Sequence, residues 1–201
     1  MKNKLWFIFL LAHLLQISCK EIPSTKEEIN RYIKNEANGF SITKKTGIFN
    51  LNVTFIPQKL KVMQENQNNI HQQDSAMQVM DKSLLFIFTI APLEGKTEGD
   101  VFMSGVNSKQ DYEERVRKAN FGFANSWTLY LDNGVEISPV GVQMEQTNGL
   151  TNDRKFHILF DISQNMEANE SKIWDLKLND EVFNCGIHHF VFMEQDRNRL
   201  K

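Results

Sequence analysis

Hydrophobic and polar residues alternate along much of the chain after residue 40. In 49–55 and 156–162 every second residue is Phe, Leu, Val or Ile. Successive side chains of a strand point to opposite faces of a sheet, so this alternation predicts strands with one face in a core. Residues 84–91 instead form a continuous apolar run that Pro92 ends. A run of that length is typical of a buried central strand.

Turn signals divide the last third of the chain into further short strands. Asn133-Gly134 is a strong hairpin signal, and the returning strand is expected over 135–146. Its apolar phase slips by one residue at Ser138-Pro139, which predicts a bulge or an edge strand there. Further strands are expected over 174–178 and 182–193. About eight short strands predict a mainly β fold, an antiparallel β-sandwich of immunoglobulin- or transthyretin-like architecture.

Two or three helices are expected beside these strands, near 26–37, 58–82 and 109–119. Thr25 and Glu28 have capping-box spacing at the start of the first helix. The second segment has apolar residues at helical spacing around a polar centre, so one helix and two shorter helices both fit the pattern.

The first twenty residues have a pattern of their own. Lys2 and Lys4 precede an apolar run over 5–15, and Ser18-Cys19 follows shortly after it. A transmembrane helix needs about 20 apolar residues, so this run is too short to span a bilayer and has the length of a signal-peptide core. The stretch resembles the signal peptide of bacterial lipoproteins, in which the cysteine is lipidated and becomes the mature N-terminus.

The resemblance implies a signal peptide over 1–18 and a lipidated tether over 19–25, with acyl chains such as palmitate on Cys19. It therefore implies a protein of the bacterial cell envelope that a lipid holds on the membrane. Lys20 follows the cysteine, and by the sorting rule of some bacteria this favours the outer membrane over the inner one. The rest is expected to form one domain over 26–194 with a frayed charged tail over 195–201.

Charge and cysteine content narrow the classes of protein that fit. The 23 basic and 25 acidic residues give a net charge of -2, and no basic stripe is visible, which argues against nucleic acid as a partner. The two cysteines are Cys19 and Cys185. If Cys19 carries lipid, Cys185 has no partner for a disulfide bond.

Catalytic and metal-binding motifs are absent from the sequence, so no enzyme activity and no cofactor are predicted. The nearest approach to a site is Cys185, His188 and His189, whose thiol and imidazole groups suit zinc or copper. Adjacent residues of a strand point to opposite faces, so His188 and His189 would need a bulge at Gly186 to share a metal. The prediction is therefore that there is no metal site, with these three residues as weak candidates.

Two sets of side chains are candidates for binding surfaces. The segment 58–83 is rich in Met and Gln, and Met is flexible enough to fit varied partners. The partner surface is predicted there, at Met63, Ile70, Met77 and Met80. Tryptophan side chains often anchor protein and carbohydrate contacts, so Trp127 and Trp174 are candidates for ligand contact, although core packing suits both.

Three functions follow from these features. The first is a membrane-anchored envelope lipoprotein, not an enzyme, that acts as a protein-interaction or assembly subunit. The second is a binding module for a glycan or another small ligand. The third is a metal-binding or hydrolytic envelope protein that uses Cys185 with His188 or His189.

Overall fold

The computed structural model describes residues 22–65, 82–96, 99–147 and 151–200. Within these ranges the protein is mainly β, with nine strands in two antiparallel sheets and four α-helices. None of the helices in the described part of the chain has both the length and the apolar content to cross a membrane. The mainly β class predicted from the alternation is confirmed, while the finer architectural assignment stays a prediction.

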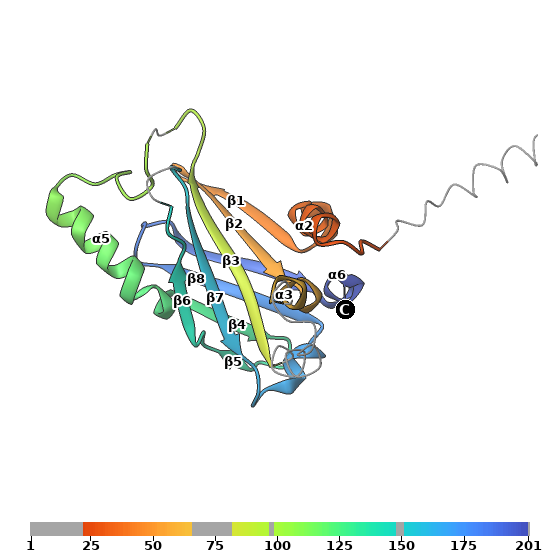
Figure 1. Cartoon of the computed structure of the whole chain (residues 1–201). Coiled ribbons are helices and arrows are strands. Elements are labelled where there is room, and N and C mark those ends of the chain that lie inside the picture. Colours follow the sequence, from red (N-terminus) through yellow and green to blue (C-terminus); the bar gives the residue numbers. More distant parts are fainter. Residues whose placement is uncertain (1–21, 66–81, 97–98, 148–150, 201) are drawn as a thin grey trace, which may run out of the picture.

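Each sheet combines strands that are consecutive in the sequence with strands from a later part of the chain. Sheet A has the order β1-β2-β3-β7-β6, and sheet B has the order β5-β4-β8-β9 (Figure 1). The strands of sheet A are β1 (Ser41–Thr46), β2 (Phe49–Ile56), β3 (Ser83–Pro92), β6 (Gly141–Met144) and β7 (Arg154–Asp161). Those of sheet B are β4 (Trp127–Leu131), β5 (Glu136–Ile137), β8 (Ile173–Asp180) and β9 (Gly186–Met193).

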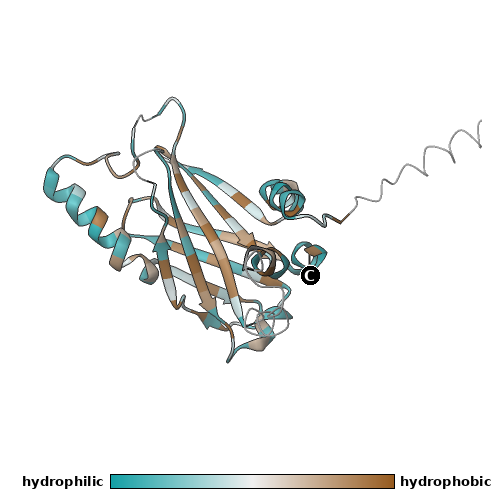
Figure 2. Cartoon of the chain, viewed as in Figure 1, coloured by the Kyte–Doolittle hydropathy of each residue, from teal (hydrophilic) through white to brown (hydrophobic). Residues whose placement is uncertain are grey.

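Aromatic side chains from the two sheets meet in a shared core. The ring centroids of Phe55 and Trp174 lie 5.1 Å apart, and those of Phe88 and Trp127 lie 5.0 Å apart. These edge-to-face contacts join β2 to β8 and β3 to β4 across the interior, in a geometry that aromatic pairs favour. Hydrophobic and hydrophilic residues alternate along the strands of the front sheet in Figure 2, as expected when one face of each strand enters this core.

The helices lie around the ends of the two sheets. The helices α2 (Lys26–Lys34), α3 (Gln58–Glu65) and α6 (Glu194–Arg197) gather at one end, and α5 (Lys109–Phe121) lies at the other side (Figure 1). The predicted capping box is confirmed, because Thr25 and Glu28 exchange hydrogen bonds with each other's backbone N–H groups. The helix expected over 58–82 is described only as far as Glu65, so its division into one or two helices lies outside the described residues.

The strand expected over 135–146 is two strands in different sheets. β5 pairs with β4 in sheet B, and β6 pairs with β7 in sheet A. The apolar phase slips at Ser138-Pro139 because the chain leaves one sheet there and enters the other, so the single continuous strand is wrong. The predicted edge position is confirmed, because β5 and β6 each lie at an edge of their sheet. The last strand is also shorter than predicted. β9 begins at Gly186, whose φ of 87° favours glycine, after a loop over 181–185.

The tail predicted to be frayed over 195–201 is ordered through residue 200, so that prediction is wrong for 195–200. It forms α6 and the 3-10 turn η4 (Asn198–Leu200), and Arg197 and Leu200 are buried. The Arg197 guanidinium lies 3.7 Å from the centre of the Trp174 ring and donates hydrogen bonds to the carbonyls of Phe192 and Ser171. Burial lowers the pKa of Arg197 to about 10. A cation–π contact and two carbonyl acceptors hold this short segment in place, and neither has a signal in the local sequence.

The loop between β8 and β9 is organised by one carboxylate. The side chain of Asp180, which is buried, accepts hydrogen bonds from the backbone N–H groups of Val182, Phe183 and Cys185 at 2.7 to 3.1 Å. Asn184 adopts a φ of 58° within this loop, a conformation that asparagine tolerates. The carboxylate therefore fixes the point at which β9 begins.

Replacing Asp180 with alanine is expected to lower the free energy of unfolding by about 2–4 kcal/mol, because buried N–H groups lose a charged acceptor. Urea denaturation of the purified chain measures this change. The matched control is Asp161→Ala, since the Asp161 carboxylate is exposed and accepts its backbone hydrogen bond from Ser163 at the surface. A loss of stability no larger than that of the control would contradict the assigned role of Asp180.

Candidate functional site

The outer side of β9 carries exposed apolar side chains. Alternate residues Phe190 and Phe192 are buried in the core, whereas Ile187, Val191 and Met193 are 60%, 45% and 39% exposed. The strand itself carries no charged side chain other than its two histidines. We refer to Ile187, Val191 and Met193 as the β9 stripe.

One side of the β9 backbone pairs with no strand of the described part of the chain, because β9 is the last strand of sheet B. The N–H of Glu194 donates to the carbonyl of Lys172 at 2.8 Å, which makes these two residues a hydrogen-bonded pair. Such pairs alternate along an antiparallel ladder, so Phe192, Phe190 and His188 bond to β8. The residues between them, the β9 stripe and His189, direct their N–H and C=O groups to the open edge.

A side-chain hydrogen bond and a cation–π contact lie beside the β9 stripe on the outer face of sheet B. His189 Nδ1 lies 2.8 Å from Asp175 Oδ2, and the Lys177 ammonium lies 5.7 Å from the centre of the Tyr130 ring. Asp175 faces Val191 and Lys177 faces His189 in the strand register. The face therefore combines an apolar edge with polar side chains that partner one another.

The edge of β9 lies beside β1, the edge strand of sheet A. The Thr46 hydroxyl donates to the carbonyl of Cys185 at 3.5 Å, and the Lys44 ammonium lies 5.6 Å from the centre of the Phe190 ring. On the opposite side of the molecule the chain itself joins the sheets through residues 138–140. We call the gap between β1 and β9 the open seam. Its two strands hold Lys44, Lys45, His188 and His189 and no carboxylate.

The structure keeps the weak metal-site candidates apart. His188 Nε2 lies 2.9 Å from the carbonyl of Cys185, whereas His189 points to the outer face and pairs with Asp175. Burial, together with the negative charge of Asp180, raises the pKa of the Cys185 thiol above its ordinary value. Metal ligands and nucleophiles need the thiolate, which this setting disfavours. Among the described residues no group of three or more His, Cys, Asp or Glu side chains is placed to hold a metal ion.

Both candidate tryptophans for ligand contact lie in the core, so that prediction is wrong. Trp127 is 1% exposed and Trp174 is 3% exposed. The indole N–H of Trp174 donates to the carbonyl of Ala168 at 2.7 Å. Each tryptophan stands at an inward position of its strand, where its ring fills space between the two sheets.

The other predicted sites are described only in small part. Met63 lies on α3, half-buried against the core, and so offers less surface than an exposed partner site would. The remaining residues of the predicted partner surface, Ile70, Met77 and Met80, lie outside the described residues, as does the lipidation site, Cys19.

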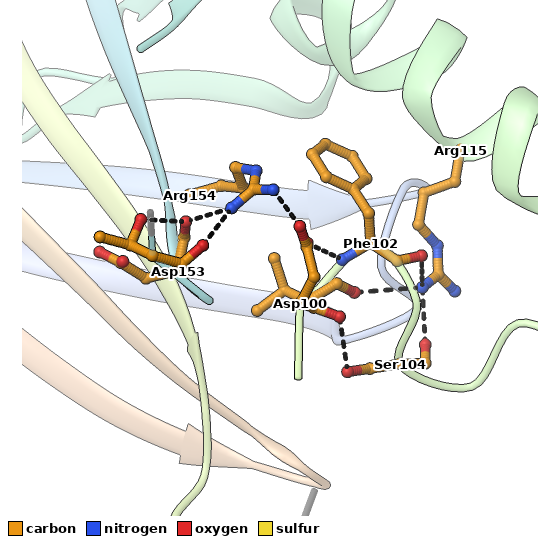
Figure 3. Close-up of polar contacts among 8 residues, drawn as sticks. Asp100, Phe102, Ser104, Arg115, Asp153 and Arg154 are labelled. Carbon is orange, nitrogen blue, oxygen red and sulfur yellow. Dashed lines mark hydrogen bonds and ion pairs between the residues drawn. The ribbon is translucent and has the colours of Figure 1, made fainter. Parts of the chain in front are cut away.

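Two buried arginines, Arg115 and Arg154, hold the loop over 100–104 in place. The sequence patterns did not indicate this role for either arginine. Arg115 from α5 donates to the carbonyls of Val101, Phe102 and Ser104, and Arg154 from β7 pairs with the carboxylate of Asp100 (Figure 3). Arginine charge is a poor signal of burial in a sequence, because most charged residues are exposed. The loop is fixed from two sides and presents Met103, which is 58% exposed.

A shallow cleft of about 280 Å³ lies between α5, β6 and this loop. Its wall is half apolar by residue, and Arg154 with three polar residues of the chain after β6 forms the other half. The lining residues are Phe102, Tyr112, Val116, Met144, Glu145, Gln146, Thr147 and Arg154. Ligand pockets begin at about 300 Å³, so the cleft suits only a small molecule or a single side chain.

Comparisons with known proteins assign no family to the chain. No protein-family model matches it, and no curated protein matches its sequence significantly. Among solved structures, the chain is similar to a protein of unknown function from Burkholderia pseudomallei, with 10% sequence identity and a TM-score of 0.41. That similarity covers 88% of this chain and 91% of the other, and it indicates no function.

The Cys185 thiol is expected to react with iodoacetamide at pH 8.5 at least about tenfold more slowly in the folded protein than in urea, because its raised pKa keeps it protonated. A Cys19→Ser chain leaves Cys185 as the single thiol. The folded pKa lies above the unfolded one, so stability should fall as the pH rises through about 8.5, where the unfolded thiol ionises. Cys185→Ala should remove that part of the decline, and equal rates in the two states would contradict the raised pKa.

Proposed function

We propose that this protein is a membrane-anchored lipoprotein of the bacterial envelope that acts as a protein-interaction or assembly subunit, not as an enzyme. One observation carries the proposal: β9 combines exposed apolar side chains with backbone groups that no other strand of the described residues pairs, along the same residues. Natural proteins normally protect such an edge with charge, proline or a covering segment. β9 has no lysine, no proline and no acidic residue, which suits a strand that a partner covers.

The mode of contact is addition of a strand to β9. An extended segment of another protein would bond to the free N–H and C=O groups, while the β9 stripe would contact alternate side chains of that segment. This mode suits the immunoglobulin- or transthyretin-like sandwich that we propose for the architecture, because an open sandwich leaves edge strands available. The two antiparallel sheets and the open seam support that assignment.

The N-terminal sequence supports the membrane part of the proposal. Each buried acyl CH₂ contributes about 0.8 kcal/mol, and two or more chains on Cys19 give stable anchoring. Lys20 favours the outer membrane among the envelope membranes. An anchor confines the protein to a surface and so raises its effective concentration toward a partner on the same membrane.

A photoreactive amino acid in place of Ile187 is expected to yield a discrete cross-linked product in cells, because that position lies on the edge that the partner covers. The same group in place of Leu159 is the control, since Leu159 is a 40% exposed apolar residue on β7, an interior strand with a partner on each side. The product cross-linked through position 187 should disappear when Val191 is changed to lysine. It should persist when Leu159 is changed to lysine instead. Gel electrophoresis measures the amount of cross-linked product for the two photoreactive positions and for the two lysine variants.

Cys19→Ser tests the anchor in the same cells. The change should move the protein from the membrane fraction to the soluble fraction and abolish incorporation of a labelled fatty acid. A product that forms equally well from Ile187 and Leu159 would refute the β9 contact. Unchanged membrane association of the Cys19→Ser protein would refute the anchor alone, so the two parts of the proposal are tested separately.

The cleft between α5 and β6 favours a second candidate function, a binding module for a glycan or another small ligand. Its wall presents Phe102, Tyr112 and Met144 beside the buried Arg154, a combination of apolar surface and a few polar groups that is typical of ligand sites.

A ligand of this cleft should raise the melting temperature of the purified protein in the absence of any protein partner, since it binds only the folded state. A panel of small glycans tests this by thermal unfolding, with Val116→Arg to fill the cleft and Leu159→Arg as the control. A shift that survives Val116→Arg would place the ligand elsewhere.

A further inference from the structure

The open seam between β1 and β9 is charged on one side. Lys44 and Lys45 of β1 and His188 and His189 of β9 are the titratable groups of these two strands. Lys44 reaches across the seam to the ring of Phe190, and among the described residues no carboxylate lies within ion-pair distance of it. The Lys44 ammonium therefore lies at the open seam, and the ring of Phe190 is the one contact of this cation among the described residues.

The strand register says which side chains of an added strand would meet this cation. Directly opposed residues of paired strands point to the same face. Residues opposite Ile187, Val191 and Met193 would therefore lie on the outer face, beside the β9 stripe. Residues opposite His188 and Phe190 would point inward and meet Lys44 across the seam. The two faces of the added strand thus need different chemistry.

We propose that the partner segment that adds to β9 is an extended strand that alternates apolar residues with carboxylates, its carboxylates opposite His188 and Phe190. This inference rests on the proposed function and names the chemistry of its partner. Charge complementarity carries it, because an acidic side chain at either position would pair with Lys44, and His188 is a nearby hydrogen-bonding group. A second copy of β9 does not meet the requirement, since its sequence contains no carboxylate.

Short synthetic peptides test the chemistry with the purified full chain. One labelled peptide alternates valine with glutamate, and its matched control alternates valine with lysine. Fluorescence anisotropy should show the glutamate peptide binding at least about tenfold more tightly, a factor that corresponds to about 1.4 kcal/mol. Val191→Lys should abolish binding of the glutamate peptide, which locates it on β9.

Variants of the two neighbouring lysines separate the seam from general charge. Lys44→Met keeps an aliphatic stem over Phe190 and should weaken the glutamate peptide about tenfold, whereas Lys44→Arg should keep binding. Lys45→Met removes the same charge from the adjacent, exposed position and should change binding by less than about threefold. Circular dichroism confirms that each variant is folded. Equal effects of Lys44→Met and Lys45→Met would overturn the inference.

Other outcomes distinguish this inference from the function on which it rests. If Ile187 forms its cross-linked product in cells but the two peptides bind alike, the partner covers β9 without the proposed acidic face, and this inference alone fails. If sedimentation shows a dimer that Val191→Lys dissociates, the occupant is a second copy, which also overturns it. If there is neither a cross-linked product nor peptide binding, both proposals fail.

Discussion

Contact between the aromatic faces of two sheets is the interaction on which the rest of the structure depends. A pair of strands or a short helix is marginal in water by itself, so each element here gains stability only through the shared core. The rings of Phe55, Phe88, Trp127 and Trp174 join the sheets at their centres. The helices then close the ends, and Arg197 covers one of these rings from outside.

The way in which the sheets are joined determines where the molecule is open. The chain passes directly from β5 to β6 on one side, so the sheets are connected there by covalent structure. On the other side Lys44 of β1 contacts the ring of Phe190 on β9, and Thr46 donates to the carbonyl of Cys185 just before β9, with no strand pairing between β1 and β9 among the described residues. An edge strand with apolar outer residues therefore remains beside a cationic seam, and this arrangement is the physical basis of the proposed function.

Much of the fold could be predicted from local sequence, because alternation and capping are local signals. The strands at 49–55 and 84–91 lie within β2 and β3, and the Thr25 cap forms as expected. The passage between sheets at Ser138-Pro139 was harder, since a phase slip reads the same for a bulge and for a change of sheet. The buried tail depends on Arg197 meeting Trp174, a long-range contact with no local pattern.

The candidate site depended still more on long-range structure. Val191 and Met193 were visible as strand residues, but only the strand order makes β9 an edge and leaves them exposed. Trp127 and Trp174 show the opposite case: they were candidates for an exposed site and are buried in the core. A large amphipathic ring suits a surface and a core equally well until its neighbours are known.

The burial of Arg197 and Leu200 bears on when the protein can fold. β9 is the last strand, and Arg197 and Leu200 complete the layer that covers Trp174. A chain that is made in order, N-terminus first, can form the hairpin of β1 and β2 early. Sheet B cannot close until residues 186–200 are present, because they supply its edge strand and the contacts at its end. Folding of sheet B is thus expected to be completed after folding of the β1–β2 hairpin.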